Sequence, residues 1–327
     1  MVFDKTDRKD QREALGEIFP ILGQEYPDLV VLSPDTSRST GAAKFRDAFP
    51  ERFLCTGVSE MNTLAMAAGL ALEGWMPLVA GFAMFVGGKA WEPIRNAIAY
   101  PRLNVKIVAT HGGINVGPDG VTHQMIEDIA LMRALPGMTV LAPTDANQVL
   151  PVLRAALDYE GPVYVRLERD AMPLLNEPQE KYEIGTSLIV RQGKDVTLIG
   201  EGSMVFTALE AADVLAKEGI EALVISAVSI KPLDVKVIVE AATRTEAVVA
   251  LEDHNRHGGL GSAVAEVLAL HHPCPMEQIA LQDTYAESGK ATQLRTKFGM
   301  AESDVVEAVH RVLRRRASFT GAGHACR

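Results

Sequence analysis

Residues 105–124 have the sequence Val-Lys-Ile-Val-Ala-Thr-His-Gly-Gly-Ile-Asn-Val-Gly-Pro-Asp-Gly-Val-Thr-His-Gln. The first part, residues 105–109, is an apolar run of strand length, and the rest is a glycine-rich loop that carries two histidines and an aspartate. In α/β proteins ligands bind beyond the carboxyl ends of parallel strands, where such loops lie. The stretch therefore predicts an α/β fold with ionisable side chains at the end of this strand.

Apolar runs of similar length lie on both sides of this stretch, at residues 29–32, 76–80, 139–142 and 163–167. They are rich in Val, Ile and Leu and do not alternate with polar residues, which is typical of parallel strands covered on both faces. Amphipathic segments separate them, at residues 9–24, 60–73, 84–99, 123–134 and 145–158. This alternation of strands and helices predicts a doubly wound α/β domain.

A polar segment with two prolines, residues 172–181, is expected to be a linker. A second alternation follows, with strands at 196–199, 222–225 and 247–251 and helices near 204–217, 233–243 and 260–270. We therefore predict two doubly wound α/β domains with mainly parallel sheets, over residues 1–180 and 181–316. Residues 317–327 have no periodicity and are expected to form a disordered tail.

The composition excludes several classes of function. The 327 residues contain 32 Lys and Arg against 42 Asp and Glu, a formal charge of −10, so we expect neither nucleic-acid binding nor membrane binding. The three cysteines are widely spaced, and the first thirty residues have no apolar signal core, which favours a cytoplasmic location. The low-charge run 74–88 contains Pro77 and is too short to cross a bilayer as a helix.

Several glycine and histidine patterns are better explained by turns than by ligands. The segment 81–89 ends in Gly-Gly-Lys but fails the phosphate-loop pattern at two positions. The Gly-x-Gly pairs at 200–202 and 259–261 lack the third glycine and the acidic residue of a dinucleotide site. The histidines at 254, 257, 271 and 272 lack a third ligand at suitable spacing, so no metal site is expected in this chain.

Three polar or aromatic segments follow successive strands and together suggest a site. Glu60 lies at the start of a small-residue helix, Phe82 and Phe85 lie where a strand meets a helix, and His111 and His123 belong to the glycine-rich loop. Each has an ordinary explanation, because a carboxylate complements a helix dipole and paired phenylalanines usually pack in a core. Their recurrence at the ends of successive strands favours a shared active site.

These motifs resemble the pyrimidine-binding domain of transketolase. The resemblance rests on Gly-x-x-Glu at 57–60, Gly-Phe-x-x-Phe at 81–85, the Thr-His…Gly-x-Asp-Gly-x-Thr-His-Gln block at 110–124 and Ala-Pro-Thr-Asp-Ala at 142–146. Glu-Asp-His at 252–254, before Gly-Gly-Leu-Gly at 258–261, resembles the transketolase carboxyl-terminal domain. The Asp-Gly-x-Thr-His block is shared with deoxyxylulose phosphate synthases, whereas Gln124 and the Thr-His pair at 110–111 favour transketolase.

The resemblance implies thiamine diphosphate as cofactor, with its pyrimidine held by this chain. Full-length transketolases carry an amino-terminal domain with Gly-Asp-Gly and a following Asn, which bind the diphosphate and a divalent cation. That pattern does not occur in this sequence. We therefore expect the carboxyl-terminal subunit of a split transketolase, whose partner is an amino-terminal, diphosphate-binding subunit holding Mg²⁺ or another divalent cation. Two copies of each are expected to form a heterotetramer.

The family pattern also implies roles at the cofactor. Glu60 is expected to face a pyrimidine nitrogen, where a buried carboxyl group can share a proton with the ring. Phe82 is expected to stack on the pyrimidine and Phe85 to complete the apolar wall. His111 and His123 match loop histidines that contact substrate and move protons.

The remaining predicted residues concern the substrate and the cofactor's surroundings. Asp119 matches an aspartate that binds a donor-sugar hydroxyl, and Arg169 matches a phosphate-binding arginine. Arg38 and Ser39 lie near a second phosphate-contacting stretch, and Asp35 matches an aspartate near the cofactor. The sequence departs from the family at residues 87–88, where two glycines replace a stretch that often has a tyrosine.

The predicted function is transfer of a two-carbon ketol unit between phosphosugars, as one subunit of a heteromeric transketolase. Two alternatives remain open at this point. One is a subunit of the deoxyxylulose phosphate synthase or pyruvate-decarboxylating type, and the other is a scaffold relative without catalysis.

Overall fold

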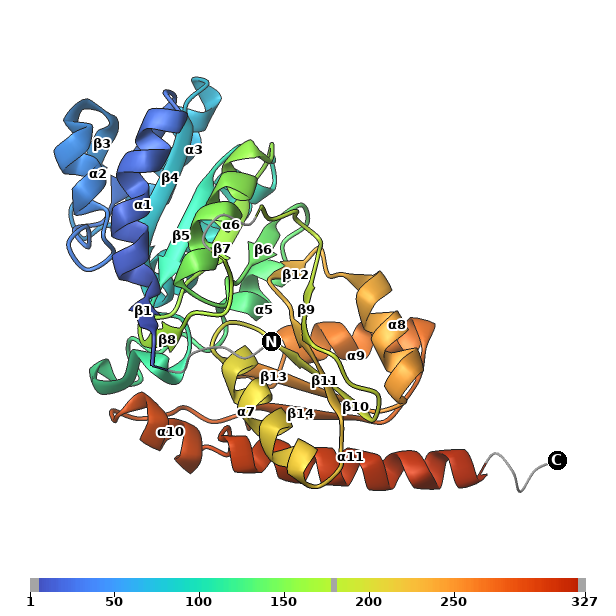
Figure 1. Ribbon diagram of the computed structural model, residues 1–327. Helices are drawn as coiled ribbons and strands as arrows, with labels where there is room; N and C mark the ends of the chain where they lie inside the picture. The colour runs from blue at the N-terminus through green and yellow to red at the C-terminus, as the bar shows by residue number, and fades with distance from the viewer. Residues whose placement is uncertain (1–5, 178–180, 323–327) are drawn as a thin grey trace.

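The computed structural model describes residues 6–177 and 181–322 and contains two main sheets, each covered by helices (Figure 1). The first sheet has seven strands in the order β12-β6-β7-β5-β4-β2-β3. Their bounds are β2 Leu29–Ser33, β3 Phe53–Cys55, β4 Met76–Phe82, β5 Lys106–Thr110, β6 Thr139–Leu141, β7 Val163–Arg166 and β12 Ser229–Lys231. All neighbours pair in parallel except β12, which runs antiparallel to β6.

Helices cover both faces of the first sheet. On one face α1 (Gln11–Glu25) packs against α6 (Ala146–Asp158), and the core there includes Val31 and Val108. On the other face lie α3 (Glu60–Leu72) and α5 (Asp128–Arg133), over a core that includes Leu32 and Ile107. Successive strand residues thus enter two different cores, which is why the strands are apolar without alternation.

The second sheet has five strands in the order β14-β13-β10-β11-β9. Their bounds are β9 Leu188–Arg191, β10 Val196–Gly200, β11 Ala222–Ser226, β13 Val248–Asn255 and β14 Met276–Leu281, and β9 alone is antiparallel to its neighbour. Helices α7 (Met204–Lys217) and α11 (Glu302–Ala322) cover one face, and α8 (Val235–Thr245) and α9 (Leu260–His271) cover the other. The core beneath α8 and α9 is continuous with that of the first sheet.

Short elements complete the chain. A two-stranded sheet joins β1 (Arg8–Asp10) to β8 (Ala171–Pro173), so the start of the predicted linker is paired with the beginning of the chain. The other elements are α2 (Ala43–Ala48), the 3₁₀ turns η1 (Pro50–Arg52) and η4 (Ile114–Asp119), and α10 (Ala291–Lys297).

Three segments differ from the sequence-based expectation. Residues 83–99 form two π-helical segments, η2 (Ala83–Lys89) and η3 (Ile94–Ala99), separated by the short helix α4 (Trp91–Pro93), in place of the single helix predicted there. Residues 123–127 belong to a loop rather than to the helix predicted there. Helix α11 continues six residues into the predicted tail, to Ala322, and residues 323–327 lie outside the described residues.

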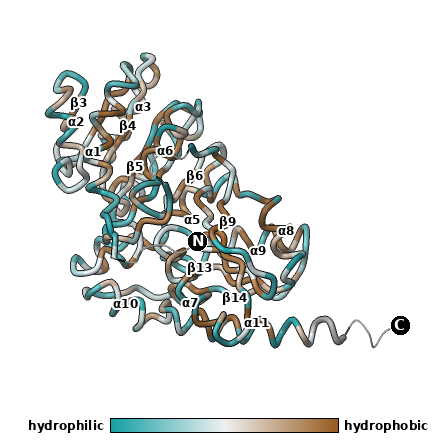
Figure 2. Tube along the Cα trace, in the orientation of Figure 1, coloured by the Kyte–Doolittle hydropathy of each residue, from teal (hydrophilic) through white to brown (hydrophobic). Residues whose placement is uncertain are grey.

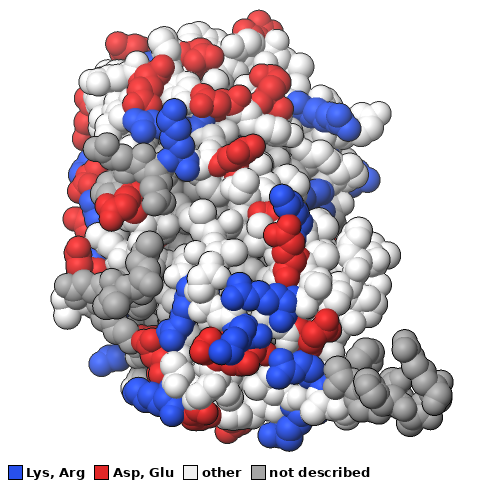
Figure 3. Space-filling view, turned by 45° about the vertical axis from the view of Figure 1, so that its right-hand side comes forward, with Lys and Arg blue, Asp and Glu red and all other residues white. Residues whose placement is uncertain are grey.

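Hydropathy and charge are distributed as this architecture requires. Hydrophobic residues follow the strands of both sheets, and hydrophilic residues gather on outer turns (Figure 2). Acidic and basic side chains are interspersed over the face drawn in Figure 3. Within residues 6–177 and 181–322, none of the helices has both the length and the apolarity needed to cross a membrane.

Candidate active site

The strand order brings the predicted site segments to one edge of the first sheet. Strands β5, β4 and β2 are neighbours and run in the same direction. His111 follows β5, Phe82 ends β4, and Asp35 follows β2. Glu60 begins α3, just after the adjacent strand β3. The sequence prediction that these segments meet at the carboxyl ends of the strands therefore agrees with the topology.

Four predicted residues form one cluster of rings. The Phe82 ring lies 4.0 Å from the imidazole of His111 and 6.0 Å from the Phe85 ring, measured between centroids. His123 lies 5.2 Å from Phe85, nearly perpendicular to it at 79°, and 6.3 Å from Phe82. Strand β4, the π-helical segment η2 and both ends of the histidine loop (residues 111–124) thus converge on one aromatic wall.

His111 is buried, and nearby positive charges affect its protonation. Its Nδ1 lies 2.8 Å from the Thr110 hydroxyl, and its side chain is almost fully buried. Burial, together with the charges of Arg12 and Arg169, lowers the pKa of His111 to about 3. The imidazole is therefore neutral over the physiological range, and the hydroxyl contact at Nδ1 leaves Nε2 to meet a ligand.

Glu60 is buried and has a single ionic partner among the described residues. Its carboxylate is 4% exposed, and its Oε2 lies 2.6 Å from the ammonium nitrogen of Lys89. Lys89 ends η2, the same π-helical segment that carries Phe85, and its side chain is 51% exposed. Lys89 therefore links the carboxylate to the element that forms the aromatic wall.

Asp119 and Arg169 were predicted separately as substrate ligands, and they form an ion pair. The Arg169 guanidinium lies 2.9 Å from the Asp119 carboxylate and donates a hydrogen bond of 2.8 Å to the carbonyl of Val116. A cavity of about 460 Å³ adjoins Arg169, and Arg12 and Lys290 bring further positive charge to its lining. Asp10 and Asp170 also line this cavity, and Arg12 is paired with Asp10 at 2.5 Å, so an anionic group would meet basic and acidic side chains together.

Asp35, Arg38 and Ser39 lie on the exposed segment that follows β2. Among the described residues, no hydrogen bond or ion pair joins them to the ring cluster. Their position after a strand adjacent to β4 agrees with the predicted neighbourhood, and their roles stay predictions.

Two basic residues that pair with buried carboxylates, Lys89 and Arg166, were not predicted as part of the site. Lys89 appeared only as the end of a failed phosphate loop, and its pairing with Glu60 joins residues 29 positions apart. Arg166 is fully buried and pairs with Asp128 and Glu201, which belong to different parts of the chain. The available signal was a charged residue in an otherwise apolar run, because Arg166 is the last residue of β7 and precedes Leu167.

Metal-ligating side chains do not gather in the described part of the chain: no group of three or more His, Cys, Asp or Glu there is placed to hold an ion.

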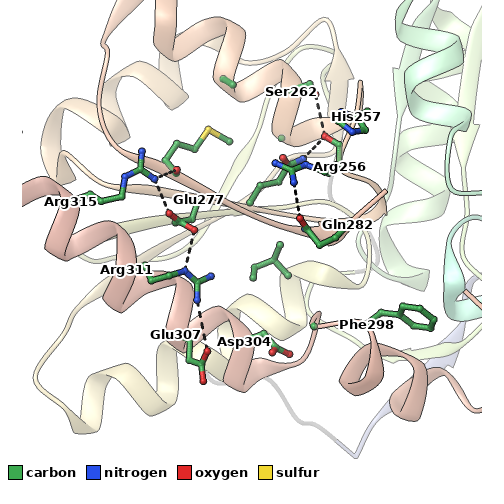
Figure 4. Close-up of a pocket in the computed structure, with 16 residues that line it drawn as sticks. Arg256, His257, Ser262, Glu277, Gln282, Phe298, Asp304, Glu307, Arg311 and Arg315 are labelled. Atoms are coloured by element: carbon green, nitrogen blue, oxygen red, sulfur yellow. Dashed lines mark hydrogen bonds and ion pairs between the residues drawn. The ribbon is translucent and has the colours of Figure 1, made fainter. Parts of the chain in front are cut away.

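Another cavity, of about 690 Å³, lies away from the ring cluster, between α9, β14 and α11 (Figure 4). It is lined by none of the predicted site residues. Its charged groups are already engaged, because Glu277 accepts from Arg311 and Arg315, and Arg256 donates to Gln282.

Comparison with known proteins identifies both parts of the chain. Residues 7–173 match the family model of the transketolase pyrimidine binding domain, and residues 185–305 match that of the transketolase C-terminal domain. The chain is 44% identical over 304 residues to a protein of Methanocaldococcus jannaschii named as a transketolase C-terminal section, covering 92% of this chain and 95% of that protein.

More distant relatives carry different activities in their names. A 6-deoxy-6-sulfo-D-fructose transketolase subunit of a Clostridium species is 35% identical, over 93% of this chain and 95% of that protein. A 1-deoxy-D-xylulose-5-phosphate synthase of Desulforudis audaxviator is also 35% identical, but the match spans only 48% of its length.

Solved structures agree with these matches. A split-gene transketolase, described as an inactive β4 tetramer, matches with a TM-score of 0.86 and 45% sequence identity. The match covers 93% of this chain and 98% of the chain in that structure. The fold prediction and the resemblance drawn from the motifs are thereby confirmed, and the chain belongs to the transketolase family.

Proposed function

We propose that this chain is the pyrimidine-binding subunit of a heteromeric, thiamine diphosphate-dependent transketolase that transfers a two-carbon ketol unit between phosphosugars. The observation that carries the proposal is the ring cluster of Phe82, Phe85, His111 and His123 at the strand ends. The buried Glu60 carboxylate, connected to the same π-helical segment through Lys89, provides the acidic group that the reaction needs.

The chain's own residues suit the pyrimidine half of the cofactor. A flat heterocycle can stack on Phe82, and a buried carboxyl group such as Glu60 can share a proton with a ring nitrogen. Thiamine diphosphate, when bound, supplies the carbanion chemistry, while the protein orients the cofactor and transfers protons.

The histidine loop suits the substrate half of the reaction. His111 is neutral, because burial lowers its pKa to about 3, so its Nε2 can accept a hydrogen bond from a substrate hydroxyl. We assign it a part in proton movement, which requires a bound ligand to raise that pKa toward the working pH. His123 faces Phe85 from the other end of the loop and is assigned the same kind of role. We assign Asp119 to a sugar hydroxyl and Arg169 to a phosphate. Each side chain must then bind the substrate either after their ion pair breaks or while it is kept. Arg38 and Ser39 would add phosphate contacts, and Asp35 would lie near the cofactor.

A second subunit is part of the proposal. Two relatives that match over 95% of their own length are named as a section and a subunit of a transketolase, which supports a partner chain. That amino-terminal partner would bind the diphosphate and Mg²⁺ or another divalent cation, in a two-plus-two assembly working in the cytoplasm. We assign residues 1–180 to the pyrimidine-binding domain and 181–316 to the second domain.

The proposal is tested by mixing this chain with a partner that carries the Gly-Asp-Gly motif, together with thiamine diphosphate and Mg²⁺. We expect ketol transfer between phosphosugars, and we expect Glu60→Ala to abolish it. Glu73→Ala is the matched control, because Glu73 is exposed at the other end of α3. Full activity in Glu60→Ala would contradict the proposal.

A second candidate reaction is supported by the sequence relatives. A deoxyxylulose phosphate synthase matches this chain over 48% of its own length, so the assembled pair should also be offered pyruvate and an aldose phosphate. Pyruvate consumption without ketol transfer would favour that candidate. Absence of thiamine diphosphate binding in calorimetry of the complete assembly would favour the scaffold alternative.

A further inference from the structure

The second domain holds the histidine loop through buried hydrogen bonds that the loop backbone donates to Asp253. Asp253 lies in β13, and its two carboxylate oxygens accept the N–H groups of Ile114 at 2.9 Å and Asn115 at 3.2 Å. The preceding residue, Gly113, has φ +75°, and a Cβ built there would lie 2.3 Å from the Asp253 carboxyl carbon. The carboxylate therefore fits closely against the backbone turn that leads away from His111.

The side chain of Asn115 adds a second attachment. Its amide nitrogen donates to the Ser203 hydroxyl at 2.7 Å and also to the Glu168 carboxylate. Its amide oxygen accepts from Arg295 at 2.8 and 3.0 Å. Ser203 and Arg295 both belong to the second domain, so the loop is held there at more than one point.

A third attachment lies at the far end of the loop. The Gln124 side chain, one residue after His123, donates to the carbonyl of Glu287 at 3.0 Å. Residues near both ends of the histidine loop are thus connected to the part of the chain that follows residue 181.

Asp253 is itself fixed by a buried network. Its N–H donates to Glu201 at 2.9 Å, and its carbonyl accepts from Arg166 at 2.7 Å. Arg166 lies 3.0 Å from Asp128 and 3.3 Å from Glu201, and all of these side chains are almost fully buried. Because each partner is desolvated, moving Asp253 would leave several polar groups unpaired.

We infer that Asp253 is a positioning residue, through which the second domain sets the histidine loop against the aromatic wall. The inference rests on the proposed function for its catalytic consequence. Asp253 is fully buried and does not line the cavity beside Arg169. It acts on the backbone at 114–115 and, through it, on His111, Asp119 and His123.

The direct test is amide hydrogen exchange in the isolated chain, comparing Asp253→Asn with the wild type. The asparagine can accept one of the two N–H groups, but it turns its own NH₂ toward the other. Loss of one hydrogen bond to a charged group should raise exchange at Ile114 and Asn115 by about ten- to a hundredfold. Asp283→Asn is the matched control, because the Asp283 side chain is 73% exposed.

The catalytic test uses the assembled enzyme. Asp253→Asn should lower kcat/KM for the ketose donor by about tenfold or more, while thiamine diphosphate affinity stays unchanged because Glu60 and Phe82 lie outside the loop. An equal loss of cofactor affinity, or wild-type kcat/KM in Asp253→Asn, would overturn the inference. If the assembly lacks ketol transfer altogether but exchange at Ile114 and Asn115 rises, the proposed function fails and the attachment stands.

Arg295→Met serves if Asp253→Asn does not fold. Arg295 lies on α10 outside the fully buried network, and its removal takes two hydrogen bonds from the Asn115 amide oxygen. Amide exchange at Asn115 should rise several-fold, because the variant loses hydrogen bonds to the Asn115 side chain and not to its backbone N–H. Unchanged exchange in this variant would count against attachment of the loop by the second domain.

Discussion

Replacing Lys89 with methionine removes the ammonium group that pairs with Glu60 and keeps a side chain of similar length. The nitrogen lies 2.6 Å from the Glu60 Oε2, close enough for a charge-assisted hydrogen bond. In the variant, the carboxylate stays buried without its only ionic partner among the described residues. We expect the folded chain to lose stability for this reason.

The size of the loss follows from the unequal exposure of the two side chains. Hydrogen bonds to charged groups contribute about 1.5–3 kcal/mol, whereas exposed ion pairs contribute about 0–1 kcal/mol. The Glu60 side chain is 4% exposed and the Lys89 side chain is 51% exposed, so water competes at one end only. We therefore expect a coupling free energy of about 1–2 kcal/mol between them.

A double-mutant cycle measures this coupling directly. Urea unfolding is measured for four proteins: the wild type, Lys89→Met, Glu60→Gln and the double variant. The cycle gives the interaction free energy of the two side chains, separated from the other effects of each single substitution. The surface pair Lys194–Glu221, at 3.0 Å with side chains 62% and 57% exposed, provides the control cycle. Its coupling should stay below about 0.5 kcal/mol. If the two cycles give the same value, Glu60 is not held by Lys89 as the structure indicates.

Two further predictions concern the buried network and the turn beside it. Burial raises the pKa of Glu201 to about 8 from its ordinary value of 4.5, so the folded state retains a proton that the unfolded state releases. The stabilisation by this retained proton is complete below pH 4.5 and is lost as the pH rises through about 8. Glu201→Gln should therefore flatten the decline in unfolding free energy between pH 5 and 8, by about 1 kcal/mol per pH unit at most. Parallel curves for the two proteins, measured by denaturant unfolding, would contradict this. Gly113→Ala should cost about 2 kcal/mol or more, because φ is +75° and the new Cβ would meet Asp253. Gly69→Ala in α3, where nothing lies within 4 Å of the new Cβ, should instead stabilise by about 0.5–1 kcal/mol, and thermal melts compare the pair.

The strands were predictable because both faces of each are buried. Val31 and Leu32 enter different cores, so the run from Leu29 is apolar without alternation and is easily recognised. The site segments were predictable because ionisable and aromatic residues follow those strands directly. His111 and Phe82 meet because β5 and β4 pair side by side, with Phe82 opposite Thr110.

The rest depended on contacts that local sequence does not encode. Residues 83–99 contain two π-helical segments, whereas their sequence has an ordinary helical period. The contact between Asp253 and Ile114 joins residues 139 positions apart, and nothing near either residue indicates the other. Strand β12 was missed because three residues are too few to show a period.

Strand β12 has a consequence for the way this polypeptide can be divided. It lies beyond residue 181, yet it forms the outermost strand of the first sheet, and Val228 receives a backbone hydrogen bond from Ala142 at 2.7 Å. A fragment ending near residue 180 would expose the unpaired border of β6 and invite aggregation. The complementary fragment would carry a strand with no sheet to join. A breakpoint between the two family matches therefore yields no pair of self-sufficient pieces, and a gene encoding this fold has reason to keep both halves in one reading frame.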